Sequence, residues 1–469
     1  MTVVLIAVAT ESGVPVFTRK RGTNESIQFS TIASLHGINM FSKCHNISMV
    51  NTLVENGTIL WKEYCKSITL IGIATSSLEC DLERLLSCAH DLMIFCLGKN
   101  ELENLKNIDQ LKRDLRLIYP MLDYLLESLD PNAISSLHPT LALDLLQSVL
   151  CSQAQQLQQV LDQYADSVTG RWACLSIHGH LVATSSDFHE LDPREARLLL
   201  LLTVAQNGAP LRETPVYLPH MSPNVAFRAV TCKLLADVYI LVVCGATPAL
   251  SLIDEIVLQC WQGYAQLIKE AKLVYPRNLP SSITFDSCVL GYVLIMYFYY
   301  RNIQVAARKS SGERNSSYTY GFAPNPSQHV PGRTGLISKL HNISLYDRIL
   351  LVNVSRRRCV FSRHTQPSTL KNRGMSGTHK IDILRTFFIT SARDLAPELR
   401  VPDSTAKGDA SLCTPAEVYS CSEYHKCHAQ RSGNLLCCVL YMSTVHTHTM
   451  RLITSQIIQD ISANKDIYW

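Results

Sequence analysis

The pattern of apolar and polar positions in the first hundred residues predicts a sheet covered by helices. Short apolar β-rich runs predict five strands, at residues 2–9, 14–18, 46–54, 58–64 and 67–74. Ser12-Gly13 forms the turn between the first two strands, and Asn56-Gly57 is a strong hairpin signal between the third and fourth. Helical spacing predicts two helices, at Phe29–Phe41 and Leu78–Leu97, the latter with one apolar side. The order is strand, strand, helix, three strands, helix.

A second stretch of the chain repeats this order of elements without sequence identity. The expected elements are strands at 172–178, 180–185, 216–219, 224–233 and 236–245 and helices at 193–206 and 248–272. Asp192 is predicted as the N-cap of the first of these helices, and Pro193 as its first residue. Two long helical patterns, Leu102–Leu129 and Thr140–Val168, lie between the two sets. An internal structural repeat is therefore expected.

The amino-acid composition changes twice along the remaining third of the chain. Ser287–Tyr300 is intensely apolar but too short for a bilayer span, which favours a buried strand or helix. Ser, Asn, Arg, Gly and Pro then dominate residues 306–377, which predicts a disordered insertion. Regular patterns return as a helix at 381–390, a buried strand at 435–443 and a final amphipathic helix at 449–461. The expected domains are 1–130, 139–275, and a split third unit of 281–305 plus 378–469, with 306–377 as the insertion.

Several short motifs, taken in order, resemble the tri-longin family of planar-cell-polarity effectors. The motifs are Ser12–Phe17 (SGVPVF), Trp61-Lys62, Ser67–Ile71, Leu82–Leu86 (LERLL), Pro215–His220 (PVYLPH) followed by Ser222-Pro223, and Thr447-His448-Thr449. The resemblance covers residues 1 to about 305 and then 378 to 469. It implies an α/β (α+β) fold of three longin-like domains. Each domain would be a mostly antiparallel five-stranded sheet flanked by helices, the third interrupted by the insertion.

The same resemblance implies a function in cilium assembly and vesicle-mediated transport. Its implied partners are an Inturned-like longin protein, a WD-repeat planar-cell-polarity effector and a Rab-type GTPase, and its implied location is the cytoplasm, the cytoskeleton and the cilium basal body. The chain is then a non-catalytic subunit that promotes nucleotide exchange only jointly with a partner. Two alternatives stay open, namely a longin-type trafficking adaptor without exchange activity and an unrecognised thiol hydrolase.

Composition excludes some partners. The net charge of +4 is too small to imply nucleic acid or an anionic membrane by itself, although peripheral membrane contact stays open. No transmembrane segment is expected, and the N-terminus enters a strand without the features of a signal peptide. The 17 cysteines are therefore expected to be mostly reduced thiols packed as small hydrophobes in a cytosolic protein. The basic run Arg356–Arg358, with Arg363 and His364 nearby, is interpreted as a solvated part of the insertion.

A search for catalytic and metal-binding patterns predicts no catalytic residue, no cofactor and no metal site. The chain contains no phosphate-binding glycine loop, no His-Glu-x-x-His helix and no Gly-x-Ser-x-Gly elbow. The strongest metal candidate combines Cys413, Cys421, His425, Cys427 and His428 with Cys437, Cys438, His446 and His448 downstream. Its spacing is irregular and lacks a Cys-x-x-Cys pair, so we interpret Cys437 and Cys438 as strand core and the histidines as loop residues.

The expected interaction surface is a sheet edge of the first domain, where unpaired backbone groups can pair with a partner strand. The residues expected to line the cores of this domain are Leu5, Ile6, Phe17, Ile32, Leu35, Leu70, Ile71, Leu85, Leu86 and Leu115.

Overall fold

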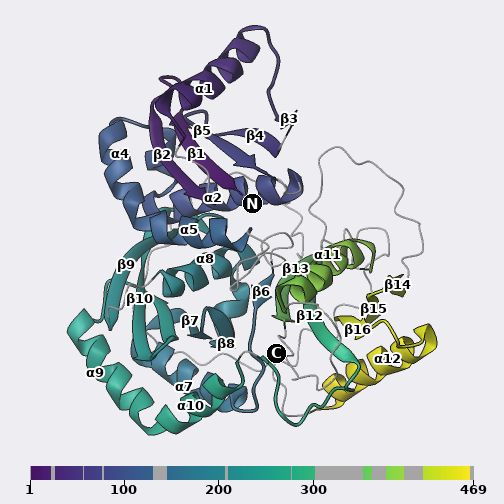
Figure 1. Ribbon diagram of the computed structural model, residues 1–469. Coiled ribbons are helices and arrows are strands. Elements are labelled where there is room, and N and C mark those ends of the chain that lie inside the picture. The colour runs from purple at the N-terminus through teal and green to yellow at the C-terminus, as the bar shows by residue number, and fades with distance from the viewer. Residues whose placement is uncertain are drawn as a thin grey trace, which may run out of the picture. The chain divides into compact units, whose positions relative to one another are not determined.

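A computed structural model gives the fold of the protein. It describes residues 2–22, 27–55, 57–75, 79–129, 145–205, 210–275, 277–301, 352–361, 377–395 and 416–464. These residues form three mostly antiparallel sheets with helices packed on them (Figure 1). The predicted fold class is confirmed.

The first sheet has the strand order β2-β1-β5-β4-β3 and is covered on both faces. Its elements are β1 (Val3–Ala9), β2 (Pro15–Arg21), α1 (Phe29–Cys44), β3 (Asn51–Val54), β4 (Gly57–Tyr64), β5 (Ile68–Ala74), α2 (Glu79–Leu97), α3 (Lys99–Glu103), α4 (Ile108–Asp114), the 3-10 turn η1 (Leu115–Ile118) and α5 (Tyr119–Ser128). Every residue of β1 is buried. Because successive side chains of a strand point to opposite faces, Leu5 joins the cluster under α2 and Ile6 joins the cluster under α1.

The predicted core of the first domain is confirmed, since all ten expected residues are buried. Gly72 of β5 explains how closely α2 approaches the sheet. A Cβ at that position would stand 2.8 Å from Leu82 and 3.2 Å from Leu86, so the absence of a side chain makes room for the two leucines.

The second domain repeats the order of elements and the order of strands. Its sheet runs β8-β7-β11-β10-β9, which matches the first sheet strand for strand. Its elements are α7 (Ala154–Ser167), β7 (Gly170–Ile177), β8 (His180–Thr184), the 3-10 turn η2 (Ser186–Glu190), α8 (Pro193–Val204), β9 (Leu211–Leu218), β10 (Ser222–Leu235), β11 (Val238–Cys244), α9 (Leu250–Trp261), the 3-10 turn η3 (Gln262–Tyr264) and α10 (Ala265–Leu273). Asp192 caps α8 by accepting the Arg194 amide at 2.9 Å, as predicted. The expected internal repeat is confirmed.

Two predicted long helices are wrong. Residues 102–129 break into short helices because Asn107 caps a new start, accepting the amides of Asp109 and Gln110. Pro120, which has no N–H to donate, opens α5 after a 3-10 turn. In the second pattern the helix begins only at Ala154. The preceding apolar run is extended instead and contains β6 (Leu146–Gln147), because short apolar runs suit a buried strand as well as a helix.

The third sheet has the order β14-β15-β16-β12-β13-β6. Its elements besides β6 are β12 (Val289–Arg301), β13 (Val352–Phe361), α11 (Gly377–Leu395), β14 (Glu417–Cys421), β15 (His425–Ser432), β16 (Leu435–Met442) and α12 (Thr447–Ala463). The apolar segment Ser287–Tyr300 is thus a strand, and its residues Val293–Ile295 are fully buried. Leaving β6 aside, the strand order again matches the first two sheets.

One part of the predicted insertion is wrong. Residues 352–361 are strand β13, which takes the sheet position that β2 and β8 hold in the other domains. The basic run Arg356–Arg358 therefore lies in a strand, and Arg358 pairs with Leu146 of β6 in a parallel ladder. The topology requires this second strand, whereas the local composition around it is polar. The rest of the insertion within 306–376, including Arg363 and His364, lies outside the described residues, and for it the insertion stays a prediction.

Across the described parts of the chain, no helix has both the length and the apolar character needed to cross a bilayer.

Candidate functional site

Helix α2 packs against elements of both the first and the second domain. One face of α2 covers the first sheet, and the helix also packs against β9 and α8 of the second domain. A single cluster of buried apolar residues runs from β1 through α2 into α8 and β11. The close approach depends on Gly98 at the end of α2, where φ is +81° and a Cβ would meet the Tyr217 ring at 2.9 Å. The two domains therefore share one core at this junction.

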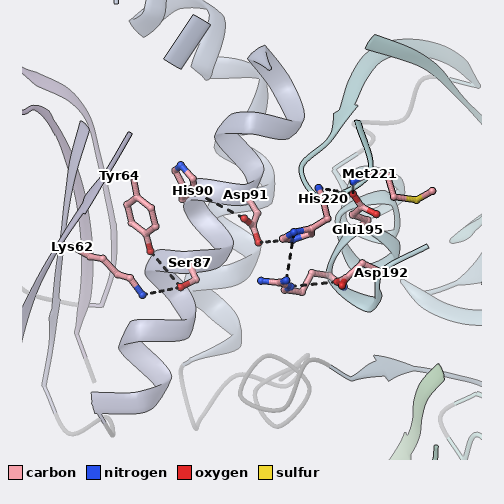
Figure 2. Close-up of polar contacts among 10 residues, drawn as sticks. Lys62, Tyr64, Ser87, His90, Asp91, Asp192, Glu195, His220 and Met221 are labelled. Atoms are coloured by element: carbon pink, nitrogen blue, oxygen red, sulfur yellow. Dashed lines mark hydrogen bonds and ion pairs between the residues drawn. The ribbon is translucent and has the colours of Figure 1, made fainter. Parts of the chain in front are cut away.

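Polar contacts complete the junction (Figure 2). Glu195 of α8 is fully buried, and its Oε1 accepts the amides of His220 and Met221 at 2.8 and 2.9 Å. This fixes the turn between β9 and β10, so that His220 Nε2 lies 3.9 Å from Asp91 Oδ2 on α2. Arg194 lies 3.5 Å from His220 on its other side. The Pro215–His220 motif thus supplies two contacts across the junction, one through Tyr217 and one through His220.

A second polar group lies between α2 and strand β4. The ring of His90 stacks on Tyr64 with centroids 4.0 Å apart, and its Nε2 lies 3.6 Å from Cys65 Sγ. Figure 2 shows Tyr64 and Lys62 reaching from the strand toward Ser87. Burial, with the nearby Lys62 charge, lowers the pKa of His90 to about 4, and burial raises the pKa of the Cys65 thiol. Both shifts oppose a thiolate–imidazolium pair, so this arrangement is unsuited to nucleophilic catalysis.

The largest group of exposed apolar side chains lies on the first domain. The described residues include sixteen exposed large hydrophobic residues. Six of them lie on α1, on β3 and in the segment between these elements, and we call this region the α1–β3 face; its residues are Ile38, Phe41, Ile47, Val50, Leu53 and Val54. Leu53 and Val54 point to opposite sides of the sheet edge, because successive side chains of a strand alternate. Two hydrogen bonds join the parts of the face, since the Ile47 amide donates to Ser42 of α1 and the Trp61 amide of β4 donates to Val50, both at 2.9 Å. Exposed apolar side chains around the edge of a sheet are typical of a protein interface.

The face borders an open sheet edge. Strand β3 is the last strand of its sheet, and no strand of the described residues pairs with its outer side. Leu53, at its centre, is 80% exposed. A strand that ends a sheet offers unpaired backbone donors and acceptors to another chain. The sequence predicted an interaction surface at a sheet edge of the first domain but not which edge, and the structure offers β3 as the candidate.

The cysteine and histidine candidates for zinc that the structure describes lie mostly in the third sheet. Cys437 and Cys438 are buried in β16, as interpreted from the sequence, and burial raises the pKa of both thiols. The interpretation of the histidines is wrong for three of them, because His425 and His428 lie in strand β15 and His448 lies in helix α12. His428 is buried between Thr454 at 2.8 Å and Glu417 at 3.4 Å, because its ring finds polar partners on α12 and β14.

Within the described ranges, no three His, Cys, Asp or Glu residues lie close enough to hold a metal ion. Cys413 lies outside those ranges, and the absence of zinc stays a prediction that metal analysis of the purified protein would test. The fourteen cysteines whose state is described are free, and eight of them are buried, as expected for thiols packed as small hydrophobes.

Comparison with protein families assigns all three domains. Residues 4–125 match the family described as "First Longin domain of FUZ, MON1 and HPS1", residues 170–262 match the second longin domain of that family, and residues 348–465 match the third. The third match includes strand β13, in agreement with its place in the sheet. The fold thus defines a protein built from three longin domains.

Comparison with individual relatives identifies the family within the longin proteins more closely. The chain is 32% identical over 301 residues to "Protein fuzzy homolog" of Xenopus tropicalis, covering 63% of this chain and 69% of the relative. It is 33% identical over 304 residues to the protein of that name from Homo sapiens, covering 63% and 70%. The mouse protein of that name is 30% identical over 301 residues, covering 62% and 70%. The chain belongs to the Fuzzy family, which confirms the tri-longin resemblance.

Proposed function

We propose that this chain is a non-catalytic longin subunit that pairs through its α1–β3 face with a second, Inturned-like longin protein. The pair then regulates a Rab-type GTPase in cilium assembly, planar cell polarity and vesicle-mediated transport. A WD-repeat planar-cell-polarity effector is the further partner. The chain works in the cytoplasm and at the cytoskeleton, at the cilium basal body.

The α1–β3 face is the observation that carries this proposal. Its six apolar side chains are exposed in the isolated chain, and burying them against a partner is favourable by about 25 cal/mol for each Å² of apolar surface. The open edge of β3 adds backbone hydrogen bonds to that burial. A second longin sheet offers both an edge strand and an apolar helix face, so it fits this surface better than a small ligand does.

Regulation of a GTPase needs no nucleophile in the chain. An exchange factor acts by binding the nucleotide-free GTPase more tightly than the nucleotide-bound form. A surface composed of two first longin domains can supply such differential binding. The Cys65–His90 arrangement lends no support to a thiol hydrolase, because the pKa of the thiol is raised and that of the imidazole is lowered.

Nucleotide-release assays on candidate Rab-type GTPases test the proposal. Release should accelerate with the pair and stay at the basal rate with this chain alone. Leu53→Glu should abolish pairing and acceleration together, because it places a charge on the face. Leu273→Glu is the matched control, since Leu273 is 83% exposed on α10, far from β3 in the sequence. Acceleration by the chain alone that equals the pair, or unchanged pairing in Leu53→Glu, would sink the proposal.

The adaptor alternative uses the same face but predicts a different result. A trafficking adaptor would bind its partner through the α1–β3 face and leave nucleotide release at the basal rate for every GTPase tested. The nucleotide-release assay distinguishes the exchange subunit from the adaptor, because partner binding and nucleotide release are measured in the same sample.

A further inference from the structure

Strand β4 extends beyond its neighbour β3. On one side β4 pairs with β5 from Thr58 to Tyr64. On the other side β3 reaches only Leu60, and the loop before β3 adds one more bond from the Trp61 amide to Val50. The last residues of β4 are therefore a sheet edge, although β4 is an inner strand at its start.

The Trp61–Val50 bond fixes which backbone groups face this edge. Along an antiparallel strand, alternate residues direct their N–H and C=O groups to opposite neighbours. Since the Trp61 amide points toward the β3 side, the amide and carbonyl of Glu63 point there as well. In the described structure no backbone group accepts from or donates to Glu63 on that side. One ladder position is thus vacant.

A hollow of about 390 Å³ lies at this vacant position, next to the end of β3. Its walls include Met49 and Val50 from the loop and Trp61 from β4. Two ion pairs flank it, Lys43–Glu63 on the α1 side and Lys62–Glu83 on the α2 side, the latter at 2.9 Å. Val50 also belongs to the α1–β3 face, so the hollow and the face are continuous.

We propose that this notch receives an extended segment of the partner longin protein, which continues the line of β3 along β4 and exchanges both backbone hydrogen bonds with Glu63. The inference rests on the proposed pairing. Unmatched backbone groups favour a strand over a small molecule, and the volume suits one or two side chains beside that strand. Because successive side chains of the segment face the two ion pairs in turn, polar side chains fit both positions.

Substitution at Glu63 tests the vacant ladder position. Glu63→Pro removes the N–H that points into the notch, whereas the ladder with β5 uses alternate residues, and proline is tolerated where a strand's N–H faces an open edge. Glu63→Ala is the matched control, because it also loses the ion pair with Lys43 but keeps the N–H. We expect the full-length Glu63→Pro chain to bind the partner at least tenfold more weakly than Glu63→Ala does, with similar melting temperatures.

Amide hydrogen exchange gives a second readout that needs no substitution, which matters if Glu63→Pro does not fold. Exchange of the Glu63 amide should slow when the partner binds, while amides of β2 should not change. Equal affinity of the two variants, or unchanged Glu63 exchange in the complex, overturns the notch and leaves the proposed pairing intact. Failure of the wild-type chains to bind at all counts against the proposed function itself.

Discussion

The two edges of the first sheet differ, because α5 covers the β2 edge and the β3 edge is exposed. At the β2 edge, Arg19 donates from Nε to Asp123 at 2.8 Å and Arg21 pairs with Glu127 at 3.2 Å, so α5 covers the edge. The Phe17 ring packs edge-on against Tyr119 of α5. At the β3 edge, Leu53 is 80% exposed and no described strand follows. Because proteins usually cover or charge a sheet edge, an open apolar edge is a surface at which another chain can add a strand.

The first sheet is also covered by α2, which forms the junction with the second domain. The largest loss of stability is expected from a substitution in the core at α2. Leu86→Ala should lower the free energy of unfolding by about 2–5 kcal/mol, because Leu86 of α2 is fully buried against Gly72 of β5. Denaturant unfolding measures this. A loss below about 1 kcal/mol would mean that the core at α2 relaxes more easily than its burial indicates.

Gly98→Ala should cost less, on the order of 1–3 kcal/mol, because the residue has positive φ and its new Cβ would press on Tyr217. Gly37→Ala is the control. Gly37 lies in α1 with open space around its Cβ position, so alanine there should stabilise by up to about 1 kcal/mol. Thermal melts of both variants give the comparison, and equal shifts would contradict a tight junction.

Acidification should lower the stability of the first domain through His90, which packs between α2 and β4. Its pKa falls from 6.5 to about 4 on folding, mainly through burial, so the unfolded chain binds the proton more readily. Stability should be full above pH 6.5 and should decline as the pH falls toward 4, by about 1–3 kcal/mol. His90→Phe should flatten this part of the stability–pH curve. An unchanged slope would show that His90 is not the group that titrates.

The smallest stability effects should come from the edges themselves. Leu53→Glu and Arg21→Ala should each change the free energy of unfolding by less than about 1 kcal/mol, because both side chains are exposed. Their effects on partner binding should differ completely. Leu53→Glu should abolish binding and Arg21→Ala should leave it intact, as measured by calorimetry. Loss of binding in Arg21→Ala would mean that the partner uses the β2 edge.

Periodicity identified most elements of this fold because burial on one or two faces leaves a regular apolar spacing. The strand after Asn56-Gly57, the cap at Asp192 and the ten core residues of the first domain were predicted correctly. The strand predicted at 46–54 is shorter in the structure, where it spans Asn51–Val54. The errors lie where the local pattern was ambiguous. The apolar run before Ala154 fits a helix as well as a strand, and β13 is a strand only because the sheet leaves a place for it.

The sequence by itself determined the order of elements that the first two domains share and the core of the first domain, because these depend on spacing within a few residues. Only the tertiary structure decided which apolar residues stay uncovered. Leu53 and Leu60 belong to one hairpin and look alike in the sequence, yet Leu53 is 80% exposed and Leu60 is 3% exposed. The contact of Asp91 with His220 is equally absent from any local pattern. Whether a side chain is buried depends on which distant element arrives beside it, and that is a property of the folded chain alone.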